Sequence, residues 1–305
     1  MVRLGVLVVY LVSEDTEWIL AKHLEHLAQT VPSMEFKVYA AANRLPAKYL
    51  SLLRTHSFVK IVDLPATDFR RAAEHGTYLD MLASRALADG CDYLCTFDMD
   101  SWPIRNDWIG VALDKITETG AAAVAVLRAE NGDTVLPHPS FCFIEASLFR
   151  DQDCRFWVVK EDMSEPFHAF LSESGQRPDT GIAVAYCLQK KGLKWTPLTR
   201  SNKRDYHYLM GGIYGGLIFH LGAAGRTRRI FARDRPTWVT CATMKLRSLP
   251  WLWRYELAIS RALRWPIETW ICYRNDRAFN AIGRRLLADE QVFYQELLEP
   301  DRKRV

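Results

Sequence analysis

The sequence lacks several features that would assign it to a specialised class of protein. Its seven cysteines occur singly, without C-x-x-C spacing, which argues against a disulfide framework and against a zinc knot. No uninterrupted apolar run approaches the roughly 18 residues of a membrane-spanning helix. We find no internal repeat and no low-complexity segment. The formal net charge of +4 fits an anionic small ligand or a membrane surface, but it does not indicate nucleic acid.

The remaining composition is that of an ordinary globular protein. The chain has 305 residues, of which 49% are hydrophobic and 25% are charged, enough for one main domain with a smaller attachment. We expect the single cysteines to be reduced and mostly buried, which predicts a cytoplasmic protein. Residues 1–18 are apolar at first, lack a small-residue cleavage site and turn acidic at Glu14. They predict a first strand and not a signal peptide.

Apolar strands alternate with helical stretches in the first part of the chain. Strands are predicted at 3–11, 35–43, 58–65, 91–100 and 121–128, and helices at 15–30, 46–56, 75–90 and 106–120. This rhythm predicts an α/β fold with a mostly parallel central sheet flanked by helices, which binds ligands at the carboxyl ends of its strands. Beyond about residue 130 the rhythm loosens. We predict a loop at 131–140, a strand running into a helix at 141–150, a helix at 178–192 and strands at 192–200 and 215–222.

The composition changes again near Leu249, where tryptophan and arginine interleave at roughly helical spacing. We therefore expect a main domain over 1–245, with halves 1–130 and 131–245, and a helical C-terminal extension over 246–305. The extension contains four tryptophans close to arginines: Trp251, Trp253, Trp265 and Trp270. These tryptophans either pack on the main domain or lie on a membrane surface.

Two aspartates, Asp98 and Asp100, close the apolar strand predicted at 91–100. Alternate residues of a strand share a face, and a bend would also let both side chains converge on one point. Neighbouring carboxylates raise the free energy needed to ionise both, and a hard divalent cation would relieve that repulsion. A D-x-D tripeptide is common and can simply be a solvated turn. Its place after the fourth strand favours a metal site that binds a diphosphate.

The segment HGTYLDMLASRALADGCDYLCTFDMDSWPIRNDWI, residues 75–109, resembles the centre of nucleotide-sugar-dependent glycosyltransferases of the GT-A fold, especially family-2-like ones. The resemblance covers residues 3–130 well and 130–225 loosely. It implies a Rossmann-like GT-A domain that transfers a sugar from a UDP- or GDP-sugar to a hydroxyl of a glycan, glycolipid or lipid-linked acceptor. It also implies a divalent cation, Mn²⁺ or Mg²⁺. The protein would be cytoplasmic or peripheral at the inner membrane face, without a nucleic-acid partner.

The resemblance further implies roles for individual residues. Asp98 and Asp100 would bind the cation, and Asp98 and Met99 would lie near the donor. His220, at the end of the strand 215–222, would complete the metal site, with His207 as its competitor. Asp179 would be the base of an inverting reaction. Pro178 stands where the family has a second acid, and a helix-capping role for Asp179 stays open.

Donor contacts are implied at the ends of the first strands. The residues concerned are Ser13, Asn43 and His75, with Glu14, Asp15 and Asp63 as alternatives. Three later arginines either neutralise a departing diphosphate or form a solvated basic turn: Arg226, Arg228 and Arg229.

Three other classes remain as alternatives. A haloacid-dehalogenase-like phosphatase also uses a D-x-D motif. In that fold the motif normally lies near the N-terminus and is followed by Thr or Val at the position where this chain has Trp102. A sugar-1-phosphate nucleotidyltransferase usually has a Gly-rich basic loop after its first strand, where this chain reads VSEDTEW. A non-catalytic module that binds membrane or glycan through the C-terminal extension is the non-enzymatic alternative.

Overall fold

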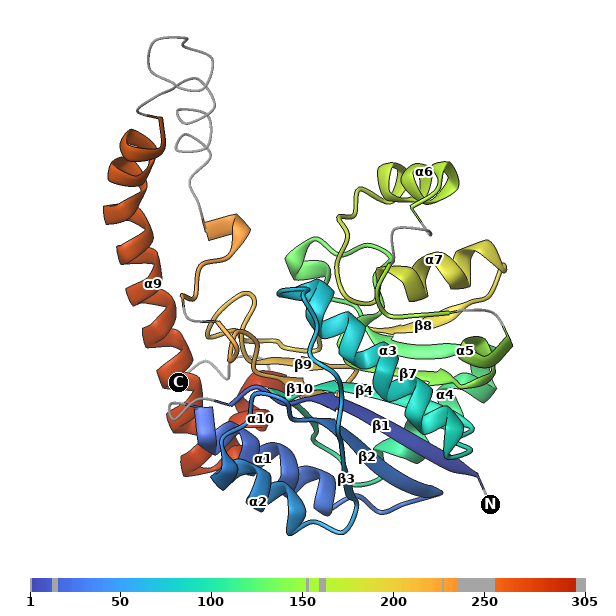
Figure 1. The fold of residues 1–305 in the computed structure, drawn as a ribbon. Helices are drawn as coiled ribbons and strands as arrows, with labels where there is room; N and C mark the ends of the chain where they lie inside the picture. The colour runs from blue at the N-terminus through green and yellow to red at the C-terminus, as the bar shows by residue number, and fades with distance from the viewer. Residues whose placement is uncertain are drawn as a thin grey trace.

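The computed structural model of the protein describes residues 2–12, 16–151, 154–158, 163–226, 228–234 and 256–299. A seven-stranded sheet forms its centre, in the order β3-β2-β1-β4-β7-β6-β8 (Figure 1). Its strands are β1 (Arg3–Val9), β2 (Glu35–Ala41), β3 (Val59–Val62), β4 (Tyr93–Asp98), β6 (Ala123–Val126), β7 (His138–Glu145) and β8 (Trp195–Leu198). Strand β7 is antiparallel to both of its neighbours, and the other neighbouring pairs are parallel. The predicted α/β fold with a mostly parallel sheet is confirmed.

Helices cover both faces of this sheet, as the sequence predicted. They are α1 (Glu17–Ala28), α2 (Ala47–Arg54), α3 (Ala72–Ala88), α4 (Trp108–Thr119), α5 (Ser147–Asp151) and α7 (Ile182–Lys190). Helix α6 (Glu165–Ser174) packs against α7 in a small cluster of its own, and the 3₁₀ turns are η2 (Ala129–Asn131) and η4 (Ala232–Asp234). One apolar cluster joins the sheet to α1, α2 and α4, and a second joins it to α3, α5 and α7. The two clusters make the sheet the buried middle layer of the domain.

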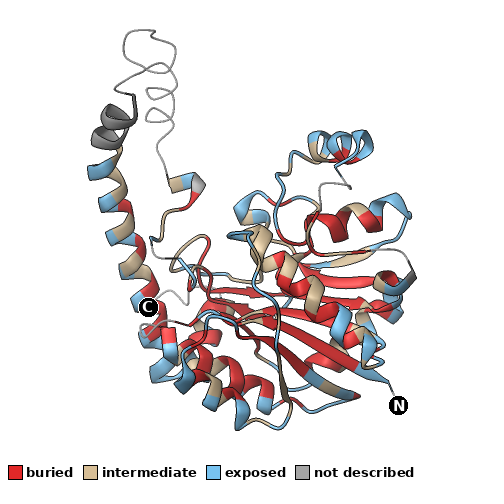
Figure 2. Ribbon diagram, in the orientation of Figure 1, coloured by how far each residue is buried: buried red, intermediate tan, exposed pale blue. Residues whose placement is uncertain are grey.

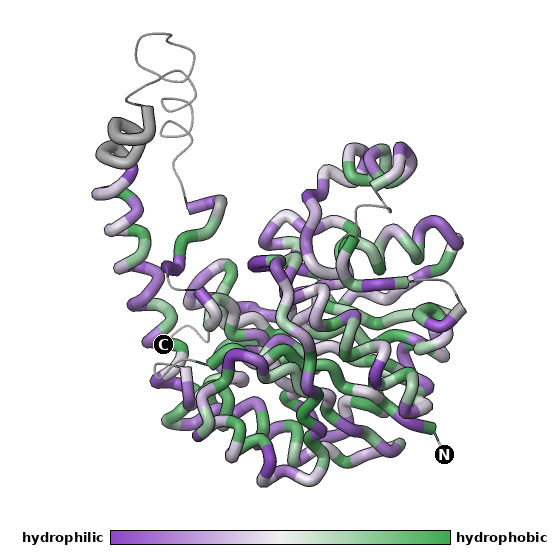
Figure 3. The backbone as a smooth tube through the Cα atoms, viewed as in Figure 1, coloured by the Kyte–Doolittle hydropathy of each residue, from purple (hydrophilic) through white to green (hydrophobic). Residues whose placement is uncertain are grey.

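The strands are apolar on both sides because both sides are covered. Val6 and Val8 of β1 belong to one cluster, and Leu7 between them belongs to the other. The central strands are accordingly almost wholly buried in Figure 2, and in Figure 3 they are the most hydrophobic part of the chain. The register pairs Val9 with both Ala41 and Asp98, so β1, β2 and β4 end at one edge of the sheet.

A second, antiparallel sheet lies beside that edge. It has the order β5-β10-β9 and consists of β5 (Ser101–Pro103), β9 (Gly212–Tyr214) and β10 (Ile218–His220). Strand β10 pairs with β5 so that His220 lies opposite Ser101. We did not predict β5 and β9, because three residues are too few to show a periodic pattern. This small sheet joins the chain around residue 220 to the end of β4.

The C-terminal part of the described chain is helical, as predicted, with α9 (Glu256–Ala288) and α10 (Glu290–Leu298). Helix α10 packs into the core through three buried side chains, Phe293, Tyr294 and Leu297. One end of α9 projects away from the domain (Figure 1), where Trp265 and Trp270 are 65% and 61% exposed. These two tryptophans therefore do not pack on the main domain, and Trp251 and Trp253 lie outside the described residues.

None of the helices in the described ranges combines the length and the hydrophobicity that crossing a lipid bilayer requires.

Candidate metal centre and its cavity

The two aspartates lie on a tight turn between β4 and β5. Strand β4 ends at Asp98, a turn covers residues 99 and 100, and β5 begins at Ser101. Ser101 Oγ donates a hydrogen bond to the Asp98 carbonyl at 3.0 Å, and Leu221 N donates to the Asp100 carbonyl at 2.8 Å. The strand therefore bends after Asp98, and this backbone bonding fixes both carboxylates at the edge of the sheet.

His220 completes a cluster of three possible metal ligands. One ligand atom from each of Asp98, Asp100 and His220 lies within 4.8 Å of the other two. His220 Nε2 is 3.7 Å from Asp98 Oδ2 and 3.4 Å from Asp100 Oδ1. The structure thus brings together the three residues that the sequence named as metal ligands.

Burial and neighbouring charges act differently on the two carboxyl groups. Burial raises the pKa of Asp98 above its ordinary value, and the neighbouring His75 and His220 side chains only partly oppose this. Burial also acts to raise the pKa of Asp100, but His220, the Ala224 N–H and Arg128 together outweigh it, so this pKa is lowered. Ala224 N donates to Asp100 Oδ2 at 3.1 Å. The surrounding protein therefore favours the ionised form of Asp100 and disfavours the ionised form of Asp98.

This donor set fits a divalent cation. Two carboxylate oxygens and one imidazole nitrogen suit Mg²⁺ or Mn²⁺, which keep further positions for other oxygen ligands. His220 Nδ1 is buried and has no hydrogen-bond partner among the described residues. The His138 ring packs beside the His220 ring at 5.7 Å between centroids, and this contact helps to set the orientation of the imidazole.

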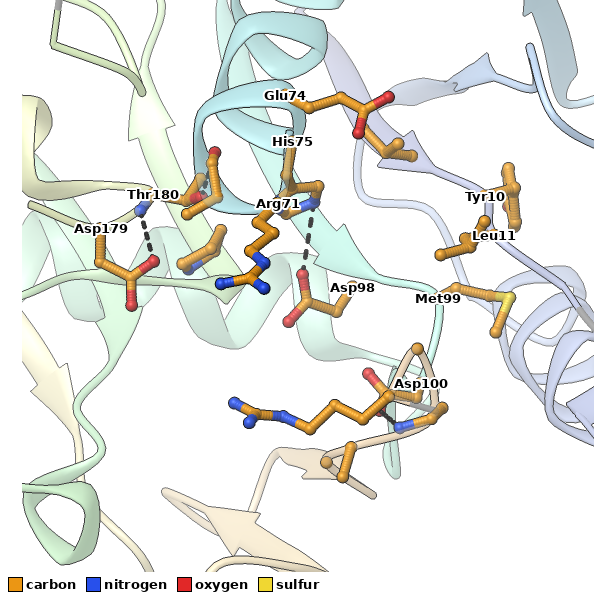
Figure 4. Close-up of a pocket in the computed structure, with 18 of the residues that line it drawn as sticks. Tyr10, Leu11, Arg71, Glu74, His75, Asp98, Met99, Asp100, Asp179 and Thr180 are labelled. Atoms are coloured by element: carbon orange, nitrogen blue, oxygen red, sulfur yellow. Dashed lines mark hydrogen bonds and ion pairs between the residues drawn. The ribbon is translucent and has the colours of Figure 1, made fainter. Parts of the chain in front are cut away.

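A cavity of about 1030 Å³ opens over these residues (Figure 4). Its lining comes from the ends of β1, β2 and β4, from the first turn of α3 and from the start of α7. His75 Nε2 lies 3.6 Å from Asp98 Oδ1, which links the first turn of α3 to the metal cluster. The cavity lies at the carboxyl ends of the parallel strands, where the sequence predicted a ligand site.

Most of the predicted donor-site residues line this cavity. Asn43, His75, Asp98 and Met99 belong to the lining, and so does the predicted base Asp179. The Asn43 side-chain amide donates to the Leu64 carbonyl at 2.6 Å, which leaves its oxygen for a ligand.

Three of the other candidates, Ser13, Glu14 and Asp15, are outside the described residues. Asp63 is not part of the lining. His207 lines a separate, smaller cavity and not the one above the aspartates.

Asp179 lies just before α7, where its carboxylate Oδ1 accepts a hydrogen bond from Thr180 N at 2.8 Å. Gly181 follows with φ of +93°, and a Cβ there would lie 2.5 Å from the Pro137 carbonyl oxygen. Only glycine fits this turn, and the turn directs Asp179 to the wall of the cavity (Figure 4).

The three predicted arginines separate in the structure. Arg226 and Arg228 line the cavity, whereas Arg229 lies outside the lining, forms an ion pair with Asp276 at 2.8 Å and packs over the Phe279 ring. Arg228 Nη1 lies 3.5 Å from Glu268 Oε2 of α9. Of the three, Arg226 lines the cavity without an ion pair to a carboxylate among the described residues.

Sequence reasoning missed other cavity residues, notably Arg71, Arg128 and His138. Arg128 follows the end of β6, and its Nη1 lies 2.9 Å from His138 Nε2. Burial, with the charge of Arg128, holds the pKa of His138 well below its ordinary value, so the ring is neutral and accepts from the guanidinium. Arg128 also contributes to the lowered pKa of Asp100, and it opposes the rise in the pKa of Asp98 that burial causes. A fixed guanidinium thus lies beside the metal cluster.

Comparisons with known proteins give only distant similarities. No family model matches the chain, and no curated protein matches it. A solved mannosyltransferase from Pyrobaculum calidifontis, in complex with GDP-Man and Mn²⁺, is similar over 95% of this chain and 80% of its own, with 13% identity and a TM-score of 0.42. Mouse xyloside xylosyltransferase 1 is similar over 65% and 85%, with 12% identity and a TM-score of 0.37. A cytidylyltransferase from Leptospira borgpetersenii is similar over 70% and 82%, with 13% identity and a TM-score of 0.42. We infer no function from these three similarities.

Proposed function

We propose that the protein is a metal-dependent glycosyltransferase of the GT-A type, which moves a sugar from a nucleoside-diphosphate sugar to an acceptor hydroxyl. The observation that supports this most is the buried cluster of Asp98, Asp100 and His220 below a cavity at the strand ends. A divalent cation held there, Mn²⁺ or Mg²⁺, would neutralise diphosphate oxygens. Arg128 lies beside the same cluster and supplies a permanent positive charge for the departing diphosphate.

The donor nucleotide would lie along the ends of β1 and β2. Tyr10, Leu11 and Asn43 line that part of the cavity, with His75, Asp98 and Met99 next to them. An apolar and aromatic wall with a few polar groups suits a base and ribose. Ser13 belongs to the same proposed region by its position after β1. The donor is a UDP- or GDP-sugar in this proposal.

The acceptor would enter on the side of the cavity where α7 begins. Asp179 Oδ1 is occupied by the Thr180 N–H, and its second oxygen is available to take the proton of an acceptor hydroxyl. The freed oxygen would then bond to the anomeric carbon as the bond from that carbon to the diphosphate breaks. This gives an inverting reaction on a glycan, glycolipid or lipid-linked acceptor, with general-base assistance of roughly 10²–10⁴-fold.

The proposal includes a cytoplasmic location, peripheral at the inner membrane face. Trp265, Trp270 and Tyr273 are exposed on the projecting part of α9, and Arg274 and Arg277 pack over two of these rings. Exposed tryptophan and tyrosine beside arginine are typical of surfaces that lie at a membrane interface. The proposal includes no nucleic-acid partner. Flotation with anionic liposomes tests the membrane contact, and replacing the three aromatic residues by serine should abolish it.

Calorimetric titration with UDP and with GDP, each with and without Mn²⁺, tests the core of the proposal. We expect one nucleotide to bind only when the cation is present. Asp179→Asn should keep that affinity and reduce sugar transfer at least a hundredfold, and equal transfer by the variant would exclude Asp179 as base. Chromatography of the products should show a nucleoside diphosphate. Released pyrophosphate would indicate a nucleotidyltransferase instead, and a trapped aspartyl-phosphate would indicate the phosphatase alternative, which the late position of the motif does not favour.

A further inference from the structure

The cavity contains more positive charge than a metal-bound donor requires. Six arginines line it: Arg44, Arg70, Arg71, Arg128, Arg226 and Arg228. Two of them are neutralised by glutamates, since Arg44 Nη2 lies 2.6 Å from Glu74 Oε1 and Arg228 Nη1 lies 3.5 Å from Glu268 Oε2. In the described ranges, the other four have no ion pair with a carboxylate.

The charge balance of the loaded site leaves an excess. A divalent cation would neutralise Asp98 and Asp100 together, which leaves Asp179 as the one unpaired carboxylate of the lining. A donor diphosphate adds about two negative charges in its metal-bound form. The four arginines without a carboxylate partner therefore outnumber the remaining negative charges. A cavity with low-dielectric walls and surplus positive charge concentrates anions.

One of these arginines, Arg71, lies on the side of the cavity where Asp179 is found (Figure 4). Arg71 precedes α3 and directs its guanidinium into the cavity, toward Asp98 and Asp179 (Figure 4). Thr180 Oγ1 donates to the Ala72 carbonyl at 3.0 Å, so the start of α3 is bonded to the segment that carries Asp179. The Arg71 side chain forms no hydrogen bond or ion pair among the described residues, so its guanidinium is free to bind an anion.

Arg226 lines the same cavity from the loop after β10. Its guanidinium packs over the Phe231 ring at 5.2 Å, and its Nη1 donates to the Ile230 carbonyl at 3.4 Å, which limits its movement. Burial and the like charge of Arg128 lower the pKa of Arg226, while Asp179 and Asp100 oppose this. Arg226, Arg71 and Asp179 all belong to the lining of the same cavity. An oxyanion bound by Arg226 would offset its repulsion by Arg128.

We propose that Arg71 and Arg226 form a second oxyanion site in this cavity, and that the acceptor carries the phosphate or carboxylate group that fills it. Arg128, fixed by His138 beside the metal cluster, serves the donor diphosphate instead. An acceptor held by its anionic group would present a neighbouring hydroxyl to Asp179. This inference rests on the proposed function, because it assigns the remaining positions to the donor and its cation.

Calorimetry of the full-length protein, saturated with Mn²⁺ and the nucleoside diphosphate that binds best, tests the second site. Glucose 1-phosphate is the probe, methyl glucoside is its neutral counterpart, and glucuronate separates a carboxylate preference from a phosphate preference. We expect the anionic sugars to bind the saturated protein and the neutral one not to bind. Arg71→Gln should weaken that binding about tenfold and leave the nucleotide affinity within twofold. Arg105→Gln, which removes an exposed arginine paired with Asp107, should change neither affinity.

The outcomes separate the second site from the donor site. Anionic sugars that bind only in competition with the nucleotide, or no better than methyl glucoside, would overturn the second site alone. Equal binding of glucose 1-phosphate by the parent and by Arg71→Gln would overturn the assignment to Arg71. No nucleotide binding with Mn²⁺ would overturn the proposed function and this inference together.

Discussion

Replacing Asp98 by asparagine should stabilise the metal-free protein and abolish its response to a divalent cation. The Asp98 and Asp100 carboxylates have oxygens within 4.8 Å of each other, and both are largely buried. At that separation and an effective dielectric constant of about 20, two unit charges repel by about 3.5 kcal/mol. Attraction to Arg128, His75 and His220 offsets part of this repulsion. We therefore expect Asp98→Asn to raise the free energy of unfolding by about 1–2 kcal/mol, or roughly 2–4 °C in Tm.

Asp100→Asn is the matched control and should have the opposite effect. The pKa of Asp100 is lowered, because His220, the Ala224 N–H and Arg128 favour its ionised form. Removing that charge should destabilise the metal-free protein by about 1 kcal/mol. Urea denaturation in EDTA measures both variants under one condition. The two changes in unfolding free energy should differ in sign although both remove one negative charge.

The pH dependence follows from the same two shifts. The raised pKa of Asp98 means that its contribution to stability is present below the ordinary value of 3.8 and is lost as pH rises through its folded pKa. The gain in unfolding free energy that Asp98→Asn gives should therefore be absent below pH 3.8 and should grow as the pH rises above it. The lowered pKa of Asp100 gives stability that is present above 3.8 and lost as pH falls through its folded pKa. The penalty of Asp100→Asn should fade in that acidic range.

Adding Mn²⁺ completes the test. A cation at 100 times its dissociation constant stabilises the parent by about 2.7 kcal/mol, and neither variant should show that gain. If Asp98→Asn were less stable than the parent in EDTA, the inferred repulsion between the carboxylates would be wrong. If it kept the full Mn²⁺-dependent rise in Tm, Asp98 would not be a metal ligand.

Three further predictions follow from contacts around the cavity and the core. Arg128→Gln should weaken nucleoside-diphosphate binding about tenfold in calorimetry with Mn²⁺, and a loss below twofold would remove Arg128 from the donor site. Gly181→Ala should lower the unfolding free energy by more than about 2 kcal/mol, because its Cβ would lie 2.5 Å from the Pro137 oxygen. Gly175 also has a positive φ but no atom near its Cβ position, so Gly175→Ala should lower the unfolding free energy by only about 1 kcal/mol. If the two variants lost equal stability, the inferred clash at Gly181 would be wrong. Tyr294→Phe removes the partner of Trp102 Nε1, 2.8 Å from the tyrosine hydroxyl, and should lose about 1–2 kcal/mol in urea denaturation. Tyr273→Phe, 61% exposed, should not change stability.

The sequence predicts the first half of the fold well because its signals there are local. Long apolar strands such as β1 and helices such as α3 show their periods within single segments. The reversed direction of β7 has no comparable signal, because strand direction depends on which neighbours the strand meets in the folded sheet. The three-residue strand β5 is too short for any pattern. The bend after Asp98, which β5 helps to set, was therefore left open.

The residues of the candidate site likewise fall into those that the sequence identified and those that it missed. Asp98 and His220 each end an apolar strand and Asp100 follows Asp98 by two residues, so their place in the sequence, together with the resemblance to GT-A enzymes, singles them out. Arg128 and His138 acquire meaning only through their contact with each other beside the metal cluster. Arg71 is one of two arginines in a polar loop, and only the fold shows which of them points to Asp98. A role that depends on a tertiary contact cannot be predicted from a single sequence.

The hydrogen bond between Trp102 and Tyr294 joins two residues that the ribosome makes far apart in time. Trp102 lies two residues after Asp100, and its ring is wholly buried, with its indole nitrogen bonded to Tyr294 of α10. A ribosome makes that partner 192 residues after Trp102. Until then the indole nitrogen beside the unfinished metal site lacks this partner, and we expect chaperones to bind the nascent chain in this region.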